Sequence, residues 1–108
     1  MKLKLLTIGF ASAALFSSSV YAGSITAVSW GGAYTTSQVE AYHKPWASNT
    51  GHSVVSEDYG GGLAEIRSQV EAGNVTWDIV DVELSDAVLG CDEGLLEEID
   101  TSMLPAGA

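Results

Sequence analysis

Basic residues are scarce in this sequence of 108 residues, which holds four lysines and arginines against 14 aspartates and glutamates. From residue 23 onward only Lys44 and Arg67 are basic, and that stretch carries a formal charge of −12. Such an excess of acid argues against nucleic acid and anionic membrane surfaces as partners, because both are negatively charged. It permits a cationic ligand without requiring one, since acidity for solubility alone explains the same composition.

Cysteine is also nearly absent, because Cys91 is the only one and no internal disulfide can form. It follows Val88 and Leu89 on a predicted helix, so we expect it to be buried as a small apolar residue. Pairing between two molecules is the alternative for an odd cysteine in an exported chain.

Only one long apolar run is present, Leu5 to Phe16, and it falls short of the ~20 residues that span a bilayer. Two lysines precede it, and small residues, Val20 and Ala22, stand at −3 and −1 before Gly23. This pattern predicts a secretory signal peptide over residues 1–22 that is removed on export. An uncleaved N-terminal membrane anchor is the alternative.

After the signal segment, strand and helix patterns alternate along the chain. Pro45 predicts that the first helix finishes near His43 or kinks, and Ser85 is the expected N-cap of the third helix. Glycines at 51, 73 and 94 are typical of helix ends. The predicted strands cover residues 25–30, 52–59, 77–82 and, more weakly, 95–99, and the predicted helices cover 34–46, 63–72 and 86–91.

This alternation predicts an α/β fold with a parallel open sheet and helices on both faces. The sequence over residues 23–108 then forms one unit, with the first strand between the second and the third. Because Leu104 to Ala108 has the character of a loop, we interpret the chain as the N-terminal part of a longer protein.

In open parallel sheets, ligands bind outside the carboxyl ends of the strands. The first predicted strand ends on Trp30 and two glycines, the second on Tyr59 and three glycines, and the third on Asp81 and Glu83. We expect Trp30 to face Asp81 and Glu83 across a crevice.

An indole face is a strong aromatic partner for a cation, and the carboxylates neutralise an ammonium group. The glycines that follow Trp30 let a ligand or another backbone approach closely. The crevice therefore predicts a site for an amine. In the alternative interpretation, Trp30 packs beneath a domain interface and the glycines only make a tight turn.

Other chemistries have weaker support in the sequence. The three glycines at 60–62 precede a helix and suit an anion, but GxGxxG spacing and a P-loop lysine are both absent. His43 and His52 are badly placed for a catalytic triad, and Asp78 and Asp81 point to opposite faces of their strand. We therefore predict a protein that is not an enzyme and that needs no cofactor or metal.

The stretch WDIVDVELSDAVLGCDEGLLEEID, residues 77 to 100, resembles the solute-binding proteins of ABC importers, close to the spermidine/putrescine-binding type. VSWGGAY and NTGHSVVSEDYGGG are similar to the first strand and turn, and to the second strand and loop, of that family. The similarity extends over residues 25–104. The loop DVELS departs from the polyamine pattern, which carries a proline, hydroxyls and an aromatic there.

The resemblance implies the N-terminal lobe of a two-lobed, type II periplasmic binding protein that closes on a polyamine or a similar small cation. It also implies delivery of that ligand to an ABC permease in the inner membrane. An anion or ferric complex on the same fold, or an enzyme or sensory domain, are the rival interpretations. The predicted ligand-binding residues are Trp30, Gly31, Gly32, Tyr34, Tyr59, Gly60, Asp81, Glu83 and Ser85.

Overall fold

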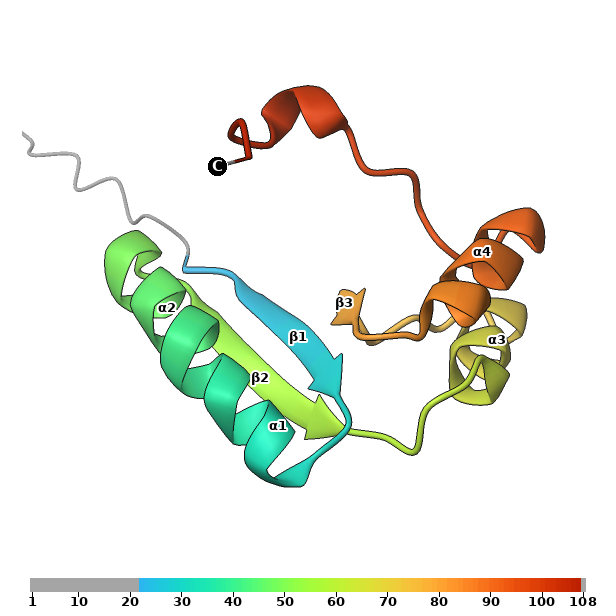
Figure 1. Ribbon diagram of the computed structural model, residues 1–108, viewed down its shortest axis with the longest axis horizontal. Helices are drawn as coiled ribbons and strands as arrows, with labels where there is room; N and C mark the ends of the chain where they lie inside the picture. Colours follow the sequence, from blue (N-terminus) through green and yellow to red (C-terminus); the bar gives the residue numbers. More distant parts are fainter. Residues whose placement is uncertain (1–21, 108) are drawn as a thin grey trace, which may run out of the picture.

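The computed structural model describes residues 22–107, which form an α/β fold around a parallel open sheet (Figure 1). Strands β1 (Ser24–Ser29), β2 (Ser53–Asp58) and β3 (Ile79–Val80) lie in the order β2–β1–β3. The fold class and this strand order are confirmed. The predicted signal peptide, except for its last residue, lies outside the described residues.

The central strand β1 is the best protected part of the sheet, because it is paired on both sides. Its last three residues, Ala27, Val28 and Ser29, are buried at 8, 2 and 1 % exposure. β3 is shorter than predicted. The Thr26 N–H of β1 donates to the Asp78 carboxylate at 2.7 Å, and it is therefore not available to extend the backbone hydrogen bonds between β1 and β3. Backbone pairing is thus confined to the neighbourhood of Ile79 and Val80.

One long helical run follows β1 and lies along the sheet (Figure 1). It consists of α1 (Gly32–Gln38), the π-helical turn η1 (Val39–His43) and α2 (Lys44–Thr50). The prediction that this helix ends near His43 is wrong. The π-helical turn accommodates Pro45, and the helix continues to Thr50. In that turn the Lys44 N–H bonds the Val39 carbonyl, five residues back. Gly51, at φ 74°, ends the run as expected.

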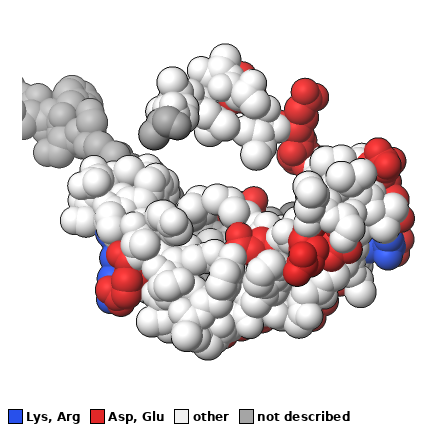
Figure 2. All heavy atoms as spheres, in the orientation of Figure 1, with Lys and Arg blue, Asp and Glu red and all other residues white. Residues whose placement is uncertain are grey.

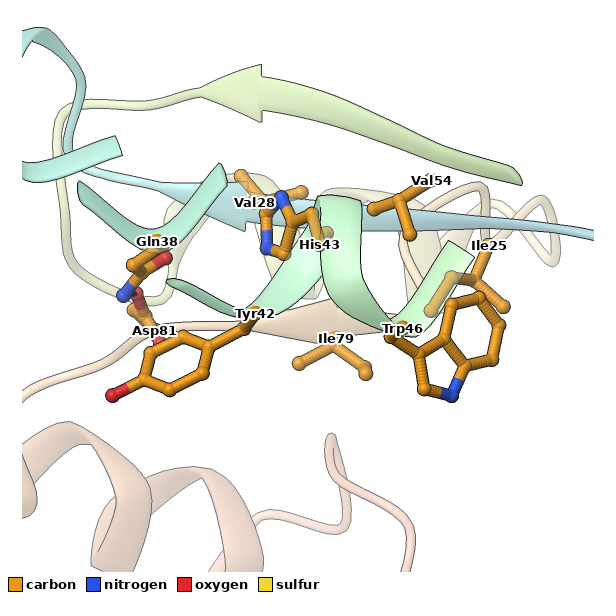
Figure 3. Close-up of a pocket in the computed structure, with 10 residues that line it drawn as sticks. Ile25, Val28, Gln38, Tyr42, His43, Trp46, Val54, Ile79 and Asp81 are labelled. Carbon is orange, nitrogen blue, oxygen red and sulfur yellow. Dashed lines mark hydrogen bonds between the residues drawn. The ribbon is translucent and has the colours of Figure 1, made fainter. Parts of the chain in front are cut away.

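The two faces of the sheet are covered differently. Alternation along the strands puts Ile25, Val54 and Ile79 on the face beneath the long helix, where Trp46 also lies (Figure 3). Val80 is on the opposite face. That face is covered by Tyr59 and Trp77, whose rings meet edge to face at 5.4 Å.

Helices α3 (Ala64–Glu71) and α4 (Leu84–Asp92) lie side by side beyond β3 (Figure 1). Leu63 and Ile66 are buried there, and Gly90 leaves room for Leu63 and Leu96 to approach α4. An ion pair between Arg67 and Glu93 joins the two helices.

Three local predictions from the sequence are wrong. Cys91 is exposed, because the side of α4 that packs inward is that of Gly90. Ser85 lies inside the first turn of α4, whose N-cap is Glu83 and has no side-chain cap bond. Residues 95–99 form no strand, since the Leu95 N–H returns to the Gly90 carbonyl at 2.8 Å to close α4.

The remaining segment contains one short element, the 3-10 turn η2 (Thr101–Met103), which Asp100 caps through the Ser102 N–H at 3.0 Å. Hydrogen bonds from Ser102 lower the pKa of Asp100. Within residues 22–107, none of the helices has both the length and the apolar character needed to cross a bilayer.

Candidate ligand-binding site

The carboxyl ends of the three parallel strands bring the predicted residues to one edge of the sheet. Ser29 pairs with Asp58, and Val28 pairs with both Glu57 and Val80, so the three strands end nearly level. The loops that leave them therefore start at the same edge. They carry the nine predicted residues: Trp30, Gly31, Gly32 and Tyr34 after β1, Tyr59 and Gly60 after β2, and Asp81, Glu83 and Ser85 after β3.

Two aromatic rings lie partly exposed at this edge. The Trp30 and Tyr34 ring centroids are 5.1 Å apart with the planes tilted by 30°. Their side chains remain 40 % and 44 % exposed, so both keep a free surface. A Cβ at Gly61 would lie 3.9 Å from the Trp30 indole nitrogen, which places the glycine loop beside the indole. The pair thus forms an aromatic platform at the strand ends.

The turn between β1 and α1 explains why glycine follows the tryptophan. Gly31 has φ 86°, and a Cβ there would come within 3.2 Å of the Asp58 carboxylate. The Gly31 N–H donates to the Thr35 hydroxyl at 2.9 Å, and that hydroxyl donates to Asp58 at 2.8 Å. The missing side chain therefore makes room for the side chain of Asp58 at the end of β2. The two expected uses of these glycines, close approach of a ligand or of another backbone, stay predictions.

Tyr59 is a buried bridge across the sheet. It is 8 % exposed, and its hydroxyl donates to the Asp81 carbonyl, which links the end of β2 to the end of β3. Burial raises the pKa of the Tyr59 phenol, and the nearby carboxylates of Asp86, Asp81 and Glu65 raise this pKa further. A hydrogen bond from Trp30 acts in the opposite direction and lowers it. The predicted contact of Tyr59 with a ligand stays a prediction, since in this structure the ring packs on Trp77.

The Asp81 carboxylate is directed toward the long helix. Its Oδ2 atom accepts a hydrogen bond from the Gln38 amide, and Figure 3 shows the two side chains meeting under α1. One oxygen of Asp81 is thus engaged on the side of the sheet away from Tyr59. Glu83 and Ser85 are exposed at the start of α4.

Two acidic residues that the sequence interpretation did not single out belong to the same region. Asp86 and Glu65 both act on the Tyr59 hydroxyl, and each lies in the first turn of its helix, α4 and α3. The sequence signal for these two residues was an acid in the first turn of a helix that follows a strand. Such an acid is also explained by its favourable interaction with the helix dipole, so the pattern alone did not identify a site.

An apolar cavity lies away from the aromatic pair. It has a volume of about 370 Å³, lies under the long helix and includes Gln38 and Asp81 near the strand ends (Figure 3). It is lined by Ile25, Ala27, Val28, Gln38, Tyr42, His43, Trp46, Val54, Ile79 and Asp81.

Charge is one-sided over the described surface. Figure 2 shows basic side chains in two places, each beside acidic atoms, and the ion pairs are Lys44 with Glu40 and Arg67 with Glu93. Both basic residues are therefore engaged away from the Trp30–Tyr34 pair. Among residues 22–107 no cluster of three or more histidine, cysteine or acidic side chains is arranged to hold a metal.

The class of protein to which this open parallel sheet belongs comes from comparison with known proteins. No protein-family model matches the chain. It is 40 % identical over 99 residues to the gamma-aminobutyric acid-binding protein of Pseudomonas aeruginosa, covering 92 % of this chain and 27 % of that protein.

Two solved structures are similar in fold. The periplasmic binding protein AgtB from A. tumefaciens R10, in complex with agropinic acid, matches with TM-score 0.72 and 36 % identity over 78 % of this chain and 26 % of its own. An ABC transporter substrate-binding protein from Bradyrhizobium japonicum matches with TM-score 0.71 and 34 % identity, covering 74 % and 25 %.

The chain spans about a quarter of the length of these relatives. Over that part its homologues are solute-binding proteins of ABC transporters, which are binding proteins and not enzymes. The broad prediction from the sequence is therefore confirmed. The finer one, the spermidine/putrescine type, is not supported, because these relatives are named for GABA and agropinic acid.

Proposed function

We propose that this chain belongs to an exported solute-binding component of an ABC importer and that it holds the amine end of a small organic solute. The observation that carries the proposal is the exposed Trp30–Tyr34 platform at the strand ends, close to the acids around Tyr59. In this proposal residues 1–22 are removed on export to the periplasm. Residues 23–108 then form part of the N-terminal lobe, and an ABC permease receives the ligand.

The chemistry follows from what the edge contains. An ammonium over the indole of Trp30 gains about 0.5–2 kcal/mol from the ring, more as water is excluded. Asp86 and Glu65 supply negative charge near Tyr59, and both basic residues of the described chain are paired elsewhere. The edge therefore favours the positive end of a ligand over an anion.

The ligand class follows from this chemistry and from the relatives together. A polyamine carries an ammonium at each end, whereas GABA carries one ammonium and one carboxylate, and either presents an amine to Trp30. The identity with a GABA-binding protein favours the amino acid. We thus place GABA-like amino acids first and keep polyamines as the second candidate.

Calorimetry on the full-length protein tests the proposal directly. The titrants are GABA, putrescine, spermidine, phosphate and ferric citrate. Binding of GABA or of a polyamine supports the amine site, and the stronger of the two fixes the ligand class. Binding of the anions alone would overturn the proposal.

A substitution at Asp86 tests the acidic contribution with a control on the same helix. Asp86→Asn should weaken binding of the amine about tenfold, the loss expected for one charge-assisted hydrogen bond of about 1.5 kcal/mol. Asp92→Asn, at the far end of α4, should leave the affinity unchanged. Equal affinities for the two variants would remove Asp86 from the site.

A further inference from the structure

His52 lies at the amino end of the sheet, opposite the ligand edge, and it binds the backbone of Gly23, the residue just before β1. Its Nδ1 atom accepts the N–H of Gly23 at 2.9 Å, and the Gly23 carbonyl accepts the Ser53 N–H at 3.1 Å. The His52 ring stacks on Trp46 with centroids 5.6 Å apart and planes at 27°. The imidazole is therefore fixed in place with an acceptor nitrogen directed at Gly23.

Gly23 is also the residue that the predicted signal cleavage exposes. If the bond after Ala22 is cut, the Gly23 nitrogen changes from an amide to an α-ammonium group, while the atom keeps its place at the start of β1. A neutral imidazole nitrogen is a good acceptor for an ammonium N–H. The bond to His52 is then charge-assisted.

We propose that His52 is the binding site for the mature N-terminus, which it holds against the start of β2 after cleavage between Ala22 and Gly23. This inference rests on the proposed export. It goes beyond it by giving a role to a histidine that the ligand site does not use.

The surroundings of the ring leave Nδ1 directed at Gly23. Trp46 stacks on the imidazole, and the Gly23 N–H meets its Nδ1 atom. In residues 22–107 no acidic or basic side chain makes a hydrogen bond or ion pair with this ring.

The test uses the full-length protein purified from the periplasm, with two variants. His52→Phe keeps an aromatic ring on Trp46 but lacks the acceptor, whereas His52→Asn places an amide oxygen near the position of Nδ1. Mass spectrometry identifies the first residue, and an aminopeptidase then measures how fast Gly23 is released at neutral pH.

The expected first residue is Gly23. Its release should be at least about tenfold faster from His52→Phe than from the wild type or His52→Asn. Equal rates for wild type and His52→Phe, or a different first residue, would overturn the proposal. Amine binding is scored separately by calorimetry, so failure of the ligand site would leave this result unchanged.

Discussion

Gly31 is the residue on which the shape of the ligand edge most depends. Its positive φ is a conformation that residues with a side chain rarely adopt, and its missing Cβ leaves room for Asp58. Gly31→Ala should therefore lower the free energy of unfolding by roughly 1–3 kcal/mol, as measured by urea denaturation. Gly32→Ala is the control, since that position also has positive φ but no atom within 4 Å. If both substitutions cost the same, contact with Asp58 is irrelevant.

Tyr59 gives a prediction about alkaline pH. Burial raises the pKa of its phenol above the value of about 10 that it has in the unfolded chain. Between those two values the folded protein holds a proton that the unfolded chain has lost. Stability is thus fully present below about pH 10 and falls as the pH rises past it.

Tyr59→Phe should remove this alkaline loss. At neutral pH it should cost about 1 kcal/mol, because the bond to the Asp81 carbonyl is lost. Urea denaturation from pH 8 to about pH 11 measures both effects. Tyr42→Phe, at a ring that is 68 % exposed, serves as the control and should leave the alkaline slope as in the wild type. An unchanged slope in Tyr59→Phe would contradict the assignment.

Pro45 is the clearest case at the scale of secondary structure. A proline inside a regular helix costs about 3 kcal/mol, but the π turn of η1 already moves the preceding carbonyls out of register. Pro45→Ala should therefore stabilise the protein by only about 1 kcal/mol, seen as a higher denaturation midpoint. A gain of about 3 kcal/mol would mean that the π turn does not reduce the cost of the proline. A loss of stability would mean that the proline positions the helix.

Local signals predicted the elements well where the deciding interactions are local. The β-branched run of residues 25–30 and the glycines at 51 and 73 gave β1 and two helix ends within a residue or two. Pro45 was correctly identified as a perturbation, but its outcome was not, because a π turn and a break share the same sequence signal. A strand needs a partner, so residues 95–99 could not be assigned from their own pattern.

The sequence predicted which residues lie at the carboxyl edge of the sheet, but not how their side chains are oriented. The rule that ligands bind at carboxyl ends placed Trp30, Tyr34 and Asp81 at one edge. No local sequence pattern indicated that the Asp81 carboxylate would accept a hydrogen bond from Gln38. Nor did any pattern indicate that Tyr59 would be buried against Trp77. Those arrangements depend on side chains more than 15 residues apart in the sequence.

At the scale of the whole molecule, the two ends of the sheet have different roles. The amino end holds Gly23 against His52 and Trp46, whereas the carboxyl end presents Trp30 and Tyr34 to solvent. The chain has a large excess of acidic residues, and its two described cations are both paired. This polarity is consistent with a cationic group at one defined edge of a larger binding protein.

The most direct measurement is calorimetric titration of the full-length protein with GABA and putrescine, comparing Trp30→Ala, Trp30→Phe and the control Trp46→Phe. For whichever amine binds, Trp30→Ala should weaken the affinity by roughly tenfold or more, Trp30→Phe by less, and Trp46→Phe not at all. If Trp30→Ala binds the amine as tightly as the wild type does, the indole does not hold the ligand and the account is wrong.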